Sequence, residues 1–128
     1  MSESIVAFQS MASTMSTTEL YSAATFASTA LLSAASYTND SVVALQTAST
    51  IVTDTTVQST LVAAANSEAQ ASTSFQSAGT LMSQAALAFE AGSVATGVGC
   101  MGSSVTAIST AVAFEAQAFT AIGGVLVI

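Results

Sequence analysis

Lysine, arginine and histidine are all absent from the 128-residue sequence, so its seven carboxylates have no basic side chain to pair with. Neutralising phosphates requires Lys or Arg, so nucleic acid is not an expected partner, and an anionic membrane surface would repel the chain. A catalytic Ser or Cys would lack its usual base, so we expect no catalytic residues and no enzyme. The seven acids are Glu3, Glu19, Asp40, Asp54, Glu68, Glu90 and Glu115.

Charged residues are also scarce. They make up 5% of the chain and hydrophobic residues 52%, whereas ordinary soluble domains carry about 25% charged residues. Disordered chains combine low hydrophobicity with high charge, so this chain is expected to fold. Its mean hydropathy of +0.70 would make a free monomer poorly soluble. We therefore expect copies of the chain to cover much of one another's surface.

Cysteine occurs once, at Cys100, which excludes an internal disulfide and suits a reducing cytoplasm. The start, "MSESIVAFQS", has an acid where a signal peptide carries its basic region, so we expect a cytoplasmic protein. The uncharged segment 91–114 is long enough to span a bilayer. It contains several glycines and few large apolar side chains, and no Lys or Arg could orient it, so membrane insertion ranks below assembly.

Proline is absent and alanine is abundant, which allows long uninterrupted helices. The expected fold is one all-α domain over residues 1–128, with long Ala/Ser/Thr-rich helices forming helical hairpins that pack side by side in a polymer. Apolar spacing predicts a first helix over 5–15. The capping box "STTE" at 16–19 predicts a second helix from Thr17, and "YTND" at 37–40 predicts its end.

From Ser41 the apolar spacing predicts a helix through "TIVTDTTVQST" at 50–60, where a strand is the alternative because β-branched residues are frequent. "ANSEAQ" at 65–70 offers another N-cap, for a helix that ends at Gly92. The glycines between 92 and 102 predict a break before a last helix over 103–122. Gly123 and Gly124 would end that helix and leave "VLVI" as a β-prone tail.

Asp40, Asp54 and Glu68 are spaced at intervals of 14 residues. A helix running through all three would place them on one stripe, and a solvated polar edge is the alternative explanation of that stripe.

Two segments of the chain are similar to each other. "TELYSAATFASTALL" at 18–32 matches "TSFQSAGTLMSQAAL" at 73–87 in seven positions without gaps. The match suggests an internal duplication, although low complexity favours such matches.

"GVGCMG" at 97–102 satisfies the dinucleotide-binding pattern G-x-G-x-x-G, with Glu115 near the interval of a ribose-binding acid. A dinucleotide fold needs further β-α units after that acid, and only 13 residues remain. Close helix packing or a helix break explains the glycines better, so no cofactor is expected. Neither the spacing of the acids nor an EF-type loop supports a metal site.

The carboxylates are best explained by assembly. "ALAFEA" at 86–91 and "AVAFEA" at 111–116 each place one glutamate in an apolar run. Like-charged, partly buried carboxylates without a cation favour the protonated form, so acid would act as a switch of the assembly. The alternative is that the charges only keep the nascent chain soluble. Asp54, Glu68, Glu90 and Glu115 are the strongest pH-sensing candidates, and Asp40, Glu19 and Glu3 are the others.

Two stretches, "VTDTTVQSTLV" at 52–62 and "SFQSAGTLMSQAALAFEA" at 74–91, resemble the R-body (refractile body) structural proteins of the RebB type. The earlier segment "ELYSAATFASTALLSAASYTND" at 19–40 looks like a second copy of the helix at 74–91. The chain lacks the Ala-Pro pair that often separates the family's motifs, and Gln58 is one place out of step. The matching residues are Val52, Thr53, Asp54, Gln58, Phe75, Gln76, Ala85 and Ala86.

The resemblance implies a bacterial cytoplasmic protein that polymerises with itself and with paralogous subunits into a ribbon, which is wound into a roll and stored as an insoluble inclusion. In bacterial endosymbionts of ciliates such rolls extend when acidified, rupture membranes and release cell contents, a killing trait that delivers toxin. Membrane contact is then expected only from the extended form. The alternatives are a pH-insensitive, pilin-like extracellular filament and a small membrane pore-former.

Overall fold

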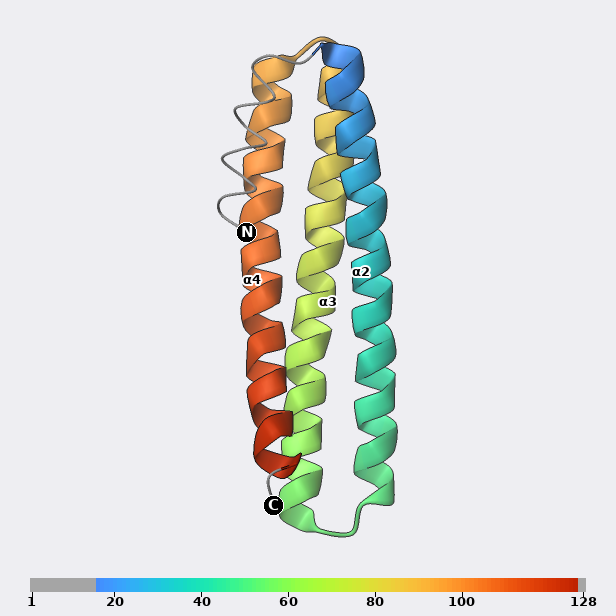
Figure 1. Ribbon diagram of the computed structural model, residues 1–128, viewed down its shortest axis with the longest axis vertical. Helices are drawn as coiled ribbons and strands as arrows, with labels where there is room; N and C mark the ends of the chain where they lie inside the picture. The colour runs from blue at the N-terminus through green and yellow to red at the C-terminus, as the bar shows by residue number, and fades with distance from the viewer. Residues whose placement is uncertain (1–15, 127–128) are drawn as a thin grey trace.

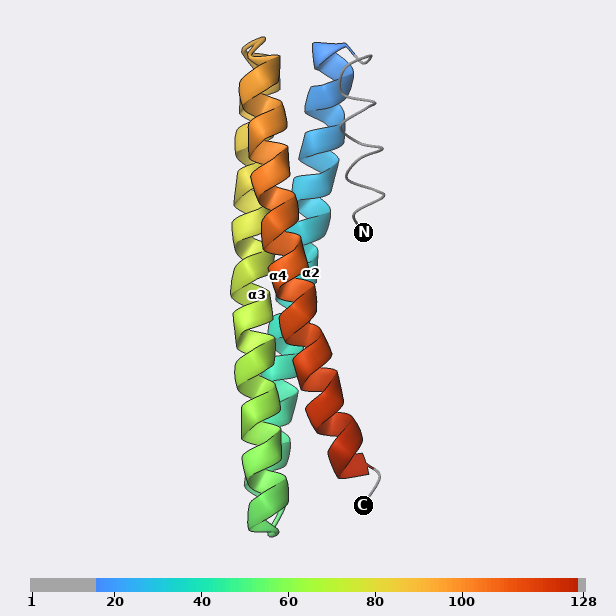
Figure 2. The ribbon, with the colours of Figure 1, turned by 90° about the vertical axis from the view of Figure 1, so that its left-hand side faces the viewer.

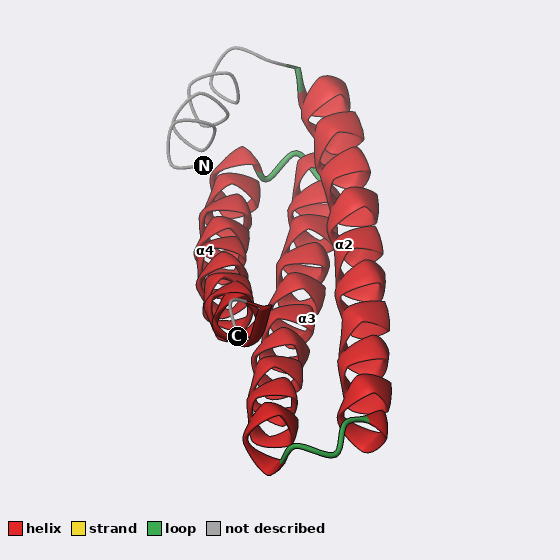
Figure 3. Cartoon of the chain, turned by 60° about the horizontal axis from the view of Figure 1, so that its bottom comes forward, coloured by secondary structure: helices red, strands yellow, loops and turns green. Residues whose placement is uncertain are grey.

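The computed structural model describes residues 16–126, and all regular structure in that range is helical (Figure 3). The expectation of an all-α fold is therefore confirmed. Three long helices follow one another in the chain: α2 (Thr17–Ile51), α3 (Thr55–Glu90) and α4 (Val94–Leu126). Consecutive helices run antiparallel, so that α2 and α4 point the same way (Figure 1). The helix expected over 5–15 and the acid Glu3 lie outside the described residues.

Helix α3 is the centre of the arrangement, because it packs extensively against both α2 and α4. Figure 1 shows it between the other two helices. Figure 2 shows that α4 is inclined to α3, so that the two separate toward the C-terminal end of α4. The closest packing of α3 with α4 is therefore near their connecting turn.

The start of α2 follows the sequence prediction. The hydroxyl of Ser16 accepts a hydrogen bond from the backbone N–H of Glu19 at 3.3 Å and donates one to Glu19 Oε1 at 3.1 Å. The predicted end at 37–40 is wrong, because α2 continues to Ile51. Thr38 and Val42 are buried, and the packing of a continuing helix outweighs the local turn preference of the polar residues.

The turn between α2 and α3 covers residues 52–54, so the stretch 50–60 is neither one helix nor a strand. Asp54 is the N-cap of α3, and its carboxylate accepts hydrogen bonds from the backbone N–H groups of Thr56 at 2.9 Å and Val57 at 3.1 Å. The side-chain amide of Gln58 donates to the carbonyl of Val52. Three of the residues that carry the family resemblance therefore build this turn. The stripe predicted for Asp40, Asp54 and Glu68 is wrong, because the turn interrupts the helix.

No N-cap occurs at 65–70, where α3 runs on with Ala65 and Glu68 buried. Helix α3 ends where the sequence predicts, at a turn around Gly92, which has a φ of +83°. The N–H of Ser93 donates to the carbonyl of Ala88 at 2.8 Å, a bond typical of the Schellman C-cap.

The break predicted across 92–102 is limited to residues 91–93, and α4 begins at Val94 rather than near 103. Glycine costs a helix about 1 kcal/mol relative to alanine, but Gly97 is buried under the ring of Phe89, where only a small residue fits. Gly123 and Gly124 also lie within α4, so they do not end it. Val125 and Leu126 of the predicted β-prone tail belong to α4, and the last two residues lie outside the described range.

Small side chains line the contacts of α3 with both neighbours. Serine hydroxyls bridge helices at three places: Ser28 of α2 donates to the carbonyl of Gly79 at 2.8 Å, Ser72 of α3 to that of Ala35 at 2.9 Å, and Ser104 of α4 to that of Ala78 at 2.7 Å. A side-chain hydroxyl reaches a neighbouring backbone only when helix axes are close, and small residues permit this approach. The three-helix unit is thus tightly packed along α3.

Candidate functional site

The core between α3 and α4 is built in layers that repeat every seven residues. From the connecting turn, α3 contributes Phe89, Met82 and Phe75 in successive layers, and all three are buried. Helix α4 contributes Val94, Met101 and Ile108 at the same interval, packed in the same apolar clusters. A seven-residue repeat keeps one stripe of a helix facing its partner.

One heptad further on, both helices present a glutamate where the pattern calls for a large apolar side chain: Glu68 on α3 and Glu115 on α4. Glu68 is buried, with 7% of its surface exposed, and Glu115 is half-buried. The third helix contributes Thr38, which is also buried. We call Thr38, Glu68 and Glu115 the carboxyl layer.

The electrostatics of the carboxyl layer favour a bound proton. Burial raises the pKa of Glu68 above its ordinary value of 4.5, and the neighbouring charge of Glu115 raises it further. In many proteins a nearby Lys or Arg would reverse this shift, but this sequence contains neither. The layer can therefore be neutralised only by protons or by ions from solution.

Thr38 links the layer by hydrogen bonding. The hydroxyl of Thr38 lies 2.7 Å from the carbonyl oxygen of Ala34 and 3.3 Å from Glu115 Oε1. A hydroxyl has one hydrogen and cannot donate fully to both oxygens. The shorter contact is the one to Ala34, so Thr38 offers Glu115 only a weak hydrogen bond.

The other described carboxylates have different surroundings. Glu19 lies in the first turn of α2 beside the N-cap Ser16, Asp54 caps α3, and Asp40 and Glu90 lie on the helix surfaces. All four are exposed. Sequence reasoning ranked Asp54 and Glu90 with Glu68 and Glu115. Only Glu68 and Glu115 are brought together in the core.

The two similar runs at 86–91 and 111–116 are not structurally equivalent. In α3 the phenylalanine, Phe89, occupies the layer position and the following Glu90 points outward. In α4 the register is shifted by one residue, so that Glu115 takes the layer position and Phe114 lies beside it. The heptad repeat therefore distinguishes Glu115 from Glu90, although their local sequences are nearly the same.

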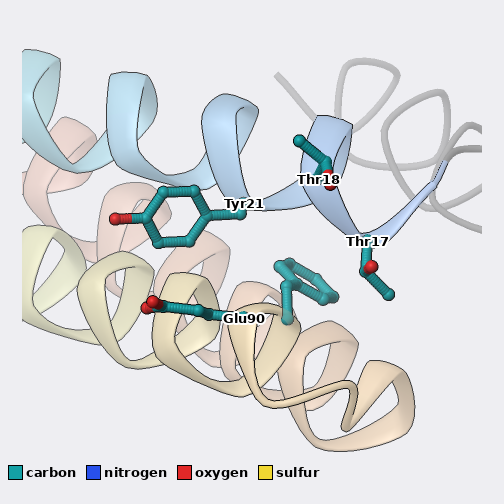
Figure 4. A pocket seen from close by; sticks show the side chains of 5 residues that line it. Thr17, Thr18, Tyr21 and Glu90 are labelled. Carbon is teal, nitrogen blue, oxygen red and sulfur yellow. The ribbon is translucent and has the colours of Figure 1, made fainter.

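Glu90 lines a shallow hollow at the end of the α2–α3 hairpin, together with Tyr21, Thr17 and Thr18 of α2 and with Phe89 (Figure 4). The hollow measures about 190 Å³, which is below the range of about 300–1,000 Å³ of small-molecule sites. Within residues 16–126 no three His, Cys, Asp or Glu side chains are grouped closely enough to hold a metal ion. Gly97, Gly99 and Gly102 are helical and form no phosphate-binding loop there.

Thr38 is the member of the layer that sequence reasoning missed. Its signal was weak, because it stands in "YTND", which we interpreted as a helix end. The heptad interval between Glu68 and Phe75, and between Ile108 and Glu115, could have identified the two acids as core residues.

Comparisons with known proteins place no constraint on this site, since no family model, no curated protein and no solved structure matches the chain. Among the described helices, α4 alone is long and apolar enough to cross a membrane by length and composition.

Proposed function

We propose that this chain is a structural subunit of a self-assembling protein ribbon of the R-body type, which changes from a coiled to an extended form on acidification. The observation that carries the proposal is the carboxyl layer: Glu68 is buried in a core position beside Glu115, in a chain without a basic side chain. The resemblance of 52–62 and 74–91 to the RebB type supports a ribbon as the form of the assembly.

The carboxyl layer gives the switch a mechanical basis. It lies beyond three apolar layers, toward the end at which α4 separates from α3 (Figure 2). At neutral pH the repulsion between the two carboxylates opposes closer packing of the helices there. Protonation removes that repulsion, so the C-terminal part of α4 can approach α3. A small change of subunit shape, repeated along a polymer, changes the curvature of the ribbon.

Self-association follows from the surface of the subunit. Large apolar side chains are well exposed on the described helices: Phe26 is 78% exposed, Ile51 74% and Tyr37 73%. Copies of the chain, together with paralogous subunits, would cover these side chains in a cytoplasmic inclusion of a bacterial cell. Membrane contact would come from the extended polymer.

The experiment is imaging of purified assemblies by negative stain at about pH 7 and again at about pH 5, closer to the ordinary pKa of a carboxyl. We expect coils at the higher pH and extended tubes at the lower. Replacing Glu68 and Glu115 together by Gln should fix one form at both pH values. The matched control is Glu19→Gln with Glu90→Gln, which removes the same charge from exposed sites and should leave the change of form intact. Identical fibres at both pH values in the unaltered protein would contradict the proposal.

A membrane pore-former is the second candidate, because α4 has the length and hydropathy of a membrane span. It predicts that detergent extracts the protein from membranes as small particles. A ribbon polymer would instead resist detergent and sediment as an inclusion.

A further inference from the structure

A groove runs between the N-terminal half of α2 and the C-terminal half of α3. Its volume is about 370 Å³, and α4 contributes none of its lining. Ser104 of α4 contacts α3 at Ala78, which is five residues from Ser83 of the groove and so about 140° around the helix from it. The groove therefore opens on a different side of α3 from α4. Its walls include Tyr21, Thr25, Ser28, Leu32, Ser83 and Leu87.

The α2–α3 hairpin that forms the groove has a local two-fold relation, which comes from the internal similarity of the chain. Ser28 and Ser83 are equivalent in the match of 18–32 to 73–87, and their hydroxyl oxygens lie 2.6 Å apart. Leu32 and Leu87 are likewise equivalent and stand on opposite walls. Two equivalent antiparallel helix segments in contact at an equivalent residue are related by a two-fold axis through that contact.

The groove is apolar at its rims and free of charge. Leu87 is 63% exposed, Leu32 46% and Tyr21 38%, and no charged residue lines the groove. The remaining lining residues are small or hydroxylated, which lets another helix approach closely. A basic partner would be drawn to the exposed carboxylates elsewhere on the surface, so an uncharged helix surface is the chemistry that the groove fits.

We propose that the occupant is a second copy of this chain, whose own α2–α3 groove face packs against the first about a two-fold axis. In such isologous pairing each copy presents the same face to the other, so no second, complementary surface is needed. Helices of about 35 residues are about 52 Å long, and two side by side are about 20 Å wide. The face thus offers about 1,000 Å² per copy, which meets the roughly 800 Å² per partner of stable pairs. The product is a four-helix bundle of two hairpins, with one α4 outside each.

This pairing goes beyond the proposed function, because it requires neither a ribbon nor acid. All tests are therefore made at neutral pH, where loss of the pairing and loss of the acid response are separate results.

The first test is disulfide cross-linking in a Cys100→Ser background. Ser83→Cys lies at the axis, where the residue meets its counterpart in the second copy, so oxidation should give a covalent dimer as the main product on a non-reducing gel. The control is Ser109→Cys, which is exposed on α4 and should stay largely monomeric. Cross-linking works on dispersed and polymerised protein alike. Equal yields at both positions, or no dimer at position 83, would overturn the proposal.

The second test uses side chains that are already exposed, so that the subunit keeps its fold. Leu87→Gln and Leu32→Gln should each weaken pairing about tenfold or more by sedimentation analysis, because every substitution acts in both copies. Val112→Gln is the matched control: Val112 is an exposed apolar residue of α4 and lies outside the groove lining. If the groove is covered by residues 1–15 or by an unrelated partner, Leu87→Gln leaves the mass unchanged, and that result overturns the proposal too.

Discussion

Ser28 and Ser83 join the two similar segments of the chain through hydroxyl oxygens that lie 2.6 Å apart. The two residues occupy the same position in the match of 18–32 to 73–87. Helices α2 and α3 run antiparallel (Figure 1), so this pair lies near the local symmetry axis of the two segments. Duplication of an ancestral helix stays a prediction, but the similarity now has a geometric counterpart in the α2–α3 hairpin.

We expect the two serines to contribute cooperatively to stability. Ser28 has one hydroxyl hydrogen, which it donates to the carbonyl of Gly79 at 2.8 Å, so Ser83 must donate to Ser28. A double-mutant cycle with Ser28→Ala and Ser83→Ala should give a coupling of about 0.5–1.5 kcal/mol in the free energy of unfolding by denaturant. The exposed equivalent pair Ser22 and Ser77 is the control, and a coupling no larger than theirs would contradict the expectation.

The helical fold was predictable because it depends on properties spread over many residues: the absence of proline, the abundance of alanine and the spacing of apolar side chains. The position of the breaks was not. "YTND" at 37–40 and the glycines from 97 to 102 carry strong local signals for a break. Thr38, however, is buried beside Glu115 of α4, and Gly97 is buried beneath the ring of Phe89 of α3. Tertiary packing decides such cases, and a single sequence does not display it.

Replacing Glu68 by Gln should stabilise the protein at neutral pH. The raised pKa of Glu68 means that the unfolded chain, with an ordinary value of 4.5, loses its proton at lower pH than the folded one. The contribution of Glu68 is therefore favourable below about pH 4.5 and is lost as the pH rises through the folded pKa. At pH 7 we expect Glu68→Gln to raise the free energy of unfolding by about 1–2 kcal/mol, a typical size for a core substitution.

The pH dependence is the decisive part of this measurement. The advantage of Glu68→Gln over the unaltered protein should shrink as the pH falls and vanish below 4.5, because Glu68 is then protonated in both states. Glu90→Gln removes one charge from the surface of the same helix and should change stability by less than about 0.5 kcal/mol. A gain that is equal for both variants would assign the effect to net charge rather than to the carboxyl layer.

The carboxyl layer was only partly predictable. Glu68 and Glu115 were candidates because each stands among apolar neighbours, but Asp54 and Glu90 met the same criterion. The two pairs differ in where each side chain lies around its helix. Asp54 caps α3 and Glu90 points outward. Glu68 and Glu115 instead continue the core-facing stripes of Phe75 and Ile108. That position depends on which residues of each helix face a neighbour, which composition does not reveal.

Replacing Glu115 by Gln should shift the titration of Glu68. The charge of Glu115 is the second cause of the raised pKa of Glu68, after burial. Its removal should therefore lower the midpoint of Glu68 toward 4.5 without bringing it fully there, since burial persists. Side-chain ¹³C NMR of selectively labelled glutamate measures the midpoint directly. Asp40→Asn, at an exposed position of α2, is the control, and an unchanged Glu68 midpoint in Glu115→Gln would show that the two carboxyls are not coupled.

Two glycines of α4, two residues apart, should respond to alanine in opposite directions. A Cβ at Gly97 would lie 2.6 Å from Cδ1 and 2.7 Å from Cζ of Phe89, whose ring is fully buried. Gly97→Ala should therefore lower the free energy of unfolding by about 1–3 kcal/mol through overpacking. A Cβ at Gly99 would meet nothing within 4 Å, so Gly99→Ala should raise it by up to about 1 kcal/mol through helix propensity. Denaturant unfolding of both variants tests which face of α4 packs against α3. If another face of α4 were packed there, alanine would be tolerated at Gly97 as well as at Gly99.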